Sequence, residues 1–121
     1  MKNYPLREVD RYSCFNDFIA GNAKKYGDKP ALSWFDRKSQ LSEVTFNQLK
    51  DDVFALRSEF TRMGYYGKHI AILGENSYEW LLVYFAATSC GAVAVCVDVE
   101  QSTETILQMI NMAHADVILI I

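Results

Sequence analysis

Residues 64–98 constrain the fold more than any other part of the chain, because they alternate between strand and helix patterns. His69–Leu73 is a short apolar run between glycines, which has the length of a buried strand and is too short for a helix. Asn76 is the expected N-cap of a helix that continues to Cys90 and is apolar on nearly all sides, so we expect it to be buried on most of them. Residues 92–97 form a second apolar run. A buried strand on each side of a crossover helix is the βαβ unit of a parallel sheet.

The part of the chain before this unit predicts a helix and a β-hairpin. Ser13 is the expected N-cap of the helix, which ends at Gly27. Gly21 lies inside this helix, where a glycine costs about 1 kcal/mol relative to alanine. Residues 31–35 and 42–44 then predict two strands that are joined by a polar turn.

Residues 46–63 show the most regular helical pattern in the chain. Thr45 and Gln48 precede and open it at the spacing of a capping box. Apolar residues recur every three or four positions, and we expect this stripe to face the sheet. They are Phe46, Leu49, Val53, Leu56, Phe60 and Met63.

After the βαβ unit, the sequence predicts one more helix, with Ser102 as its N-cap, and one more buried strand over residues 117–121. The positions of this helix that we expect to face inward are Ile106, Leu107, Ile110 and Ala113. The predicted fold class is α/β, with three layers and a mostly parallel sheet covered by helices on both faces, plus the N-terminal helix and the small β-hairpin. We expect residues 1–121 to form a single domain, in which residues 1–12 are an extended arm.

Composition favours a globular cytoplasmic protein. Half of the residues are hydrophobic and the net charge of −3 is spread without runs, which gives no basis for binding nucleic acid. The longest apolar run, residues 80–87, is far shorter than the ~20 residues of a membrane-spanning helix. The N-terminus lacks the apolar region of a secretory signal, and three cysteines outside any framework spacing fit a reducing compartment.

Few residues are candidates for chemistry. The Gly74-Glu75-Asn76-Ser77 turn lies where α/β folds bind phosphates, but Glu75 would repel an anion, so helix capping is the favoured interpretation. His69 and His114 have no acidic residues at ligand spacing, and the cysteines form no Cys-x-x-Cys pair, so both types are interpreted as structural. The cysteines are Cys14, Cys90 and Cys96.

The aromatic residues fall into two groups. Four of them lie on predicted buried faces and are interpreted as core residues: Phe46, Phe60, Trp80 and Phe85. Tyr65-Tyr66, in a loop, and Trp34-Phe35, in the hairpin, do not, and we expect them to contact a neighbouring subdomain in a larger enzyme.

Four blocks of the sequence resemble the N-terminal region of the adenylate-forming (AMP-binding) acyl-CoA synthetases, closest to the long-chain fatty acid–CoA ligases. The blocks are Gly-Asp-Lys-Pro-Ala-Leu at residues 27–32, Val-Thr-Phe-Asn-Gln-Leu at 44–49, and residues 67–80 and 90–98. They occur in the family's order, and the resemblance runs from about Phe15 to the last residue. Cys96 departs from the pattern, since the family commonly has proline there.

The resemblance implies a parent enzyme that uses ATP, Mg²⁺ and CoA to convert a carboxylic acid into an acyl-CoA. The family binds ATP with a Ser/Thr/Gly-rich loop that ends in Pro-Lys-Gly, whereas the two prolines of this sequence are Pro5 and Pro30. We therefore expect no catalytic, cofactor-binding or metal-binding residue in this chain, and we expect it to be an inactive N-terminal scaffold fragment. The apolar run at residues 117–121 adds the expectation that it pairs with the remainder of the ligase or with itself.

Two other interpretations remain open at this stage. The first is a stand-alone small α/β module that binds a ligand or a partner without catalysis. The second is a flavodoxin-like nucleotide-binding domain, for which the sequence offers no phosphate-binding loop.

Overall fold

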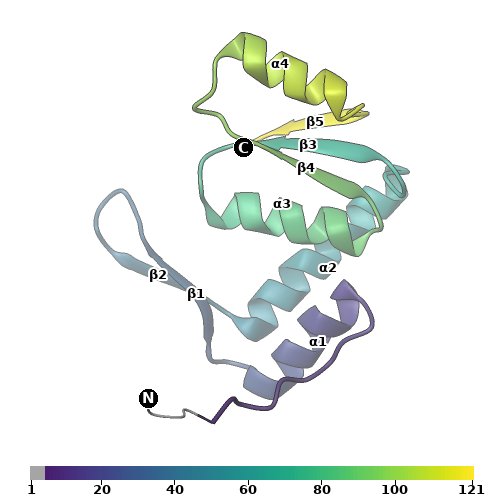
Figure 1. Cartoon of the computed structure of the whole chain (residues 1–121). Helices are drawn as coiled ribbons and strands as arrows, with labels where there is room; N and C mark the ends of the chain where they lie inside the picture. The colour runs from purple at the N-terminus through teal and green to yellow at the C-terminus, as the bar shows by residue number, and fades with distance from the viewer. Residues whose placement is uncertain (1–4) are drawn as a thin grey trace.

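The computed structural model describes residues 5–121, within which four helices and five strands are formed (Figure 1). In chain order they are α1 (Phe15–Tyr26), β1 (Pro30–Phe35), β2 (Leu41–Thr45), α2 (Phe46–Arg62), β3 (His69–Leu73), α3 (Tyr78–Ser89), β4 (Val93–Val97), α4 (Thr103–Met112) and β5 (Val117–Ile120). The strands β1 and β2 form an antiparallel hairpin, and the other three form a parallel sheet in the order β4-β3-β5. The predicted α/β fold class, with a parallel sheet and a separate hairpin, is confirmed.

The strand β3 is the centre of the sheet and separates two cores. Its residues pair in parallel with β4 on one side and with β5 on the other, so that Ile70 lies between Ala94 and Val117. Figure 1 shows α4 above the sheet and α3 below it, with α2 and α1 further below. The core on the α3 side is built from Phe60, Ile70, Ile72, Ala86, Ala87 and Cys90, and the core on the α4 side from Ala71, Val97 and Ile110.

The helix α2 packs on α3 and α1, and the prediction that its apolar stripe faces the sheet is wrong for most of its length. The helix α3 already covers that face of the sheet, so α2 lies in a further layer outside α3. Only its C-terminal end reaches the core beneath the strands, where Phe60 is buried with Ile70 and Ile72. Met63, expected in the stripe, lies beyond the helix and is exposed.

Two of the predicted helix starts are confirmed by their hydrogen bonds. At α2, the Thr45 hydroxyl accepts from the Gln48 backbone N–H at 3.1 Å, and the Gln48 side chain accepts from the Thr45 backbone N–H at 3.0 Å. At α4, the Ser102 hydroxyl accepts from the Thr105 backbone N–H at 3.2 Å. These bonds satisfy donors that the first turn of a helix otherwise leaves unpaired.

Two other predicted helix starts are wrong by one residue. The N-cap of α3 is Ser77 and not Asn76, and its hydroxyl accepts from the Trp80 backbone N–H at 3.1 Å. The N-cap of α1 is Cys14 and not Ser13, and among the described residues its side chain makes no capping bond. Several residues in each segment can cap a helix, and packing selects the one that is used.

The sheet is less completely covered than its apolar strands predict. The helix α4 packs mainly against β4, which leaves the α4-side face of β5 open. Ile118 and Ile120 share that face and are 48% and 82% exposed, so the prediction of a third strand buried on both faces is wrong. Leu107 of α4 was expected to face inward and is exposed as well. In α3, only the last part is fully buried, and residues 80–85 are half-buried.

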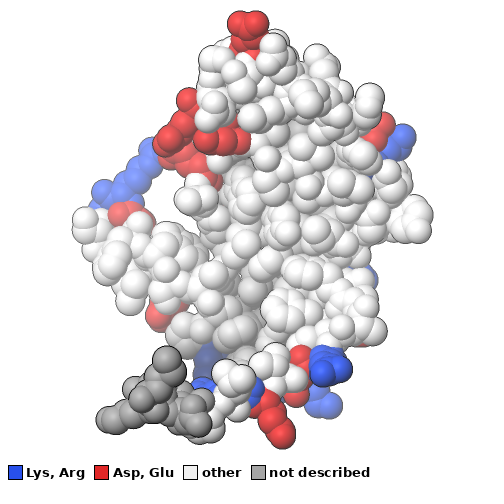
Figure 2. All heavy atoms as spheres, viewed as in Figure 1, with Lys and Arg blue, Asp and Glu red and all other residues white. Residues whose placement is uncertain are grey.

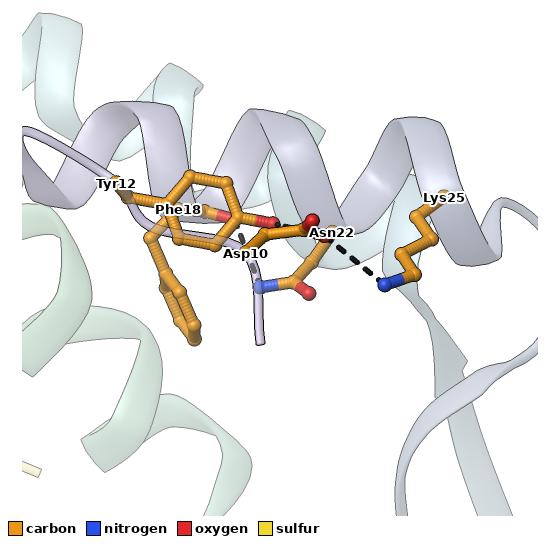
Figure 3. Close-up of polar contacts among 5 residues, drawn as sticks. All are labelled: Asp10, Tyr12, Phe18, Asn22 and Lys25. Carbon is orange, nitrogen blue, oxygen red and sulfur yellow. Dashed lines mark hydrogen bonds and ion pairs between the residues drawn. The ribbon is translucent and has the colours of Figure 1, made fainter. Parts of the chain in front are cut away.

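The segment before α1 explains the unfavourable Gly21 inside that helix. The ring of Tyr12 lies directly on Gly21, where an added Cβ would be 2.5 Å from the Tyr12 Cε1 atom. Asp10 pairs with Lys25 at 3.0 Å further along the helix, as Figure 3 shows. Residues 5–12 thus run along α1 without forming a helix or strand, whereas residues 1–4 of the predicted arm lie outside the described part of the chain.

A pair of substitutions tests which face of α2 is buried. Phe60→Ala removes a ring that is 5% exposed, and its cost should be about 3 kcal/mol in the free energy of unfolding. Ser58→Ala, two residues away on the exposed side of the same helix, should change it by less than about 0.5 kcal/mol. Urea unfolding followed by circular dichroism measures both, and equal losses would mean that the buried face of α2 is misassigned.

Candidate functional site

The carboxyl end of the parallel sheet is the edge at which α/β folds commonly bind ligands. The turn after β3 and the turn after β4 meet here around a shallow pocket of about 410 Å³. Its lining includes Glu75, Asp98 and Glu100, and Figure 2 shows acidic side chains gathered at this edge below α4. The pKa of Asp98 is lowered by hydrogen bonds from the Glu100 backbone N–H and the Gln101 side chain, so this carboxylate stays charged. The edge is therefore acidic.

The turn after β3 has the position of a phosphate site but not its chemistry. The Ser77 hydroxyl is engaged by the first turn of α3, and Glu75 brings a negative charge beside the helix N-terminus. Gly74 is needed because the chain passes close to the end of β5: an added Cβ would lie 2.9 Å from the Cβ of Ile121. The polar groups of this turn thus support the helix and the sheet.

These residues do not fit the ATP and Mg²⁺ that the resemblance implies for a parent enzyme. Carboxylates beside the α3 N-terminus disfavour a triphosphate. Within residues 5–121, no group of three or more His, Cys, Asp or Glu side chains is arranged to hold a metal ion. We derive no contact to either cofactor from this chain.

A groove lies between β1 and the start of α3, and we call it the hairpin groove. Its volume is about 630 Å³, and it is lined by residues 32–37 and by Asn76, Ser77, Tyr78, Glu79 and Leu81. Trp34 and Tyr78 stack across it with ring centroids 5.6 Å apart and an interplanar angle of 10°. Figure 2 shows the opening between the hairpin and the body of the molecule. The groove is open to ligands or to another protein segment.

Tyr78, in the first turn of α3, contacts both the hairpin and α2. The Tyr78 hydroxyl donates to the Asp52 carboxylate of α2 at 2.6 Å, while its ring stacks on Trp34 of β1. Burial, the hydrogen bond to Asp52 and the negative charges of Asp52 and Glu79 raise the pKa of Tyr78. The hydroxyl therefore remains protonated and able to donate far into the alkaline range.

The two histidines lie apart from both hollows. His69 places Nδ1 2.7 Å from the Ala113 carbonyl, which makes that nitrogen the donor, and its backbone N–H donates to Asp116. These bonds join the start of β3 to the turn before β5. His114 is exposed in that same turn, with a φ of 50°.

The three cysteines are free and occupy separate places. Cys90 is buried at the end of α3, where its thiol donates to the Ala87 carbonyl. Cys96, on β4, remains accessible, and partial desolvation raises the pKa of its thiol. Cys14 is exposed at the start of α1.

The aromatic residues divide differently from the sequence-based expectation. Of the four expected core aromatics, Phe60 is buried, whereas Phe46, Trp80 and Phe85 are half-buried. Phe35 and Tyr66 are strongly exposed, at 73% and 78%. The sequence offered no signal for the Tyr78–Asp52 bond, because its partners are 26 residues apart and come from two helices.

The fold is similar to parts of several solved structures. The N-terminal subdomain of NpsA from Klebsiella oxytoca aligns with a TM-score of 0.76 at 24% identity, over 86% of this chain and 26% of that chain. The crystal structure of CmiS6 aligns with a TM-score of 0.81 at 21% identity, over 98% and 28%. The N-terminal domain of FACL13 from Mycobacterium tuberculosis gives 0.75 at 18% identity, over 88% and 26%. At these identities the likeness establishes the fold alone, and each alignment spans about a quarter of the solved chain.

The sequence comparison gives the family. Residues 19–120 match the family described as "AMP-binding enzyme", and the chain belongs to this family. One curated relative, "Putative acyl-CoA synthetase YngI" of Bacillus subtilis (strain 168), is 27% identical over 110 residues. That match covers 90% of this chain and 20% of the relative, so the chain spans about a fifth of the relative's length. The resemblance read from the four sequence blocks is confirmed.

No helix within residues 5–121 has both the length and the apolar character that crossing a membrane requires.

Because the pKa of Tyr78 is raised in the folded chain, the free energy of unfolding should depend on pH in the alkaline range. Below the ordinary tyrosine pKa of about 10, Tyr78 is protonated in the folded and the unfolded chain, and its contribution to stability is complete. As the pH rises above that value, the unfolded chain loses its proton first, so the free energy of unfolding falls. Tyr78→Phe should lower the free energy of unfolding by about 1 kcal/mol at pH 8. Between about pH 9 and 11, the free energy of unfolding should fall less steeply for this variant than for the wild type.

Urea unfolding at a series of pH values measures this difference. Tyr66→Phe is the matched control, since Tyr66 is 78% exposed and should follow the wild-type curve. Parallel curves for Tyr78→Phe and the wild type would show that the Tyr78–Asp52 bond does not link stability to pH.

Proposed function

We propose that the chain is the N-terminal scaffold of an ATP-dependent acid–CoA ligase and is inactive alone. The observation that carries this proposal is the family match over residues 19–120, together with a curated relative described as an acyl-CoA synthetase. The parent enzyme would use Mg²⁺ and ATP to convert a carboxylic acid into an acyl-adenylate and pyrophosphate, and would then transfer the acyl group to CoA. Two steps through an activated intermediate replace one difficult acylation.

Within such an enzyme, the part formed by this chain would provide walls and not reacting groups. The hairpin groove and the open face of β5 are the surfaces that the remainder of the ligase would contact. A fatty acid as the substrate and the cytoplasm as the compartment are parts of the same proposal. The compartment is supported by three free thiols, which fit a reducing environment.

The acceptor is the part of the proposal that most needs a test. One structural neighbour is described as an adenylation–PCP di-domain NRPS, so the same fold also serves enzymes that are not described as CoA ligases. The chain alone should catalyse no ATP–pyrophosphate exchange with fatty acids above a boiled control. A longer polypeptide that carries this chain at its N-terminus should catalyse acid-dependent exchange and should consume CoA.

The proposal has two parts, the inactivity of the chain alone and the use of CoA by the parent enzyme, and different outcomes test each part. Exchange by the chain alone would contradict its role as an inactive scaffold. Acid-dependent exchange by the longer polypeptide without any CoA thioester would contradict the CoA ligase and favour another acceptor. Mass spectrometry of the acyl product distinguishes these results.

We also propose that the chain associates with itself in the absence of a partner for β5. This strand is at the edge of the sheet within the described residues, and its face carries the exposed Ile118 and Ile120. Free strand edges beside exposed apolar side chains favour association between molecules. A partner strand from the remainder of the ligase would occupy the same edge.

Light scattering at ~10–100 μM protein tests this, because micromolar interfaces are populated in that range. A dimer or larger species is expected, and Ile120→Lys should shift it toward the monomer by at least about tenfold in Kd. Val9→Lys is the matched control, because Val9 is 83% exposed but lies on the arm far along the chain from β5. A wild-type monomer throughout the range would exclude self-association.

The second candidate function is a binding module without catalysis. The hairpin groove favours it, since about 630 Å³ with stacked aromatic walls is enough for a small molecule. Failure of the longer polypeptide to catalyse exchange would favour this candidate.

A further inference from the structure

A small apolar pocket lies where α1, β1, α2 and α3 meet, and we call it the four-element pocket. Its volume is about 160 Å³, and each of the four elements contributes to its lining. It adjoins the hairpin groove, with which it shares Leu32 and Leu81. The pocket is partly open to solvent, since Phe18 is 41% exposed.

The size and lining of the four-element pocket select its occupant. An enclosed cavity of about 150 Å³ lined by apolar side chains binds benzene. The four-element pocket has nearly the same volume but is partly open to solvent, and Phe18, Phe46 and Phe85 supply its aromatic walls. Aromatic rings gain from edge-to-face and offset contacts with one another. The volume of the four-element pocket itself fits a single six-membered ring.

One polar side chain faces this otherwise apolar lining. Asn22 of α1 donates its Nδ2 group to the Phe18 carbonyl at 2.9 Å. Its Oδ1 atom accepts no hydrogen bond from any described residue, and therefore has free capacity for a donor. Figure 3 shows the Phe18 ring and the Asn22 amide projecting from the same side of α1. A hydroxyl group on a bound ring could donate to Oδ1.

We propose that the four-element pocket binds a single aromatic ring that carries one hydroxyl group. The ring lies among the phenylalanines, and the hydroxyl donates to Asn22 Oδ1. The chemical class of the ligand is thus a monocyclic phenol. This proposal is independent of the proposed ligase function, since it uses only contacts within the described residues.

Titration of the full chain with phenol, followed by NMR of methyl groups, tests the proposal. Saturation with a Kd on the order of 1 mM is expected for a ligand of so few atoms. The shifts should be confined to methyls that line the pocket, such as those of Ile19 and Leu49. The methyls of Ile106 and Ile110, on the opposite side of the sheet, should not move. Shifts scattered over both sides, or no saturation, would overturn the proposal.

A matched pair of substitutions locates the site. Ala31→Leu adds side-chain volume inside the pocket and should weaken phenol binding by at least about tenfold. Ala55→Leu makes the same change on the exposed side of α2 and should leave the Kd unchanged. Equal effects of the two substitutions would place the ligand elsewhere and overturn the proposal.

The hydroxyl contact has its own test. Benzene should bind the wild-type chain more weakly than phenol, by about fivefold for the loss of one hydrogen bond. Asn22→Leu should remove that preference while benzene still binds. A preference for phenol that persists in Asn22→Leu would overturn the role of Asn22, and a wild-type chain that binds both ligands equally would do the same.

Discussion

The central position of β3 is the constraint on which the rest of the structure depends. Ile70, Ala71 and Ile72 are fully buried because this strand is paired on both sides and covered on both faces. Alternate residues of a strand point to opposite faces, so one short segment contributes to both cores. The residues of β3 that face α3 hold the larger core, and those that face α4 hold the smaller one. A polar residue at any of these three positions would be buried in one of the two cores without a partner.

The helix α3 connects the parallel sheet to the N-terminal half of the chain, because it packs against both. One side of it covers the sheet, and the other receives α2 and α1. Its last part is fully buried, whereas residues 80–85 are half-buried although the helix is covered on two sides. Both hollows of the N-terminal half lie against it. The hairpin groove uses its first turn, and the four-element pocket uses Leu81 and Phe85.

Three polar side chains in the sheet region bond to the backbone of neighbouring segments. His69, Cys90 and Ser77 direct their polar atoms to backbone groups of neighbouring turns and helix ends. The carboxyl edge of the sheet is acidic, which favours neither phosphate nor nucleic acid at this place. The chain spans about a fifth of the length of its curated relative.

The sequence by itself determined the elements and the family. Periodicity located every helix and strand to within a few residues, because a buried face repeats every 3.6 residues in a helix and every two in a strand. Four sequence blocks indicated the family, and the match over residues 19–120 confirmed it. The tertiary structure decided which faces of the helices and strands are covered by other elements. The apolar stripe of α2 packs on α3, Ile118 and Ile120 are exposed, and the Tyr12 ring packs on Gly21. The sequence pattern did not show these contacts, because each depends on the relative positions of whole elements. The Tyr78–Asp52 bond and the two hollows arise in the same way, between segments that the sequence pattern treats separately.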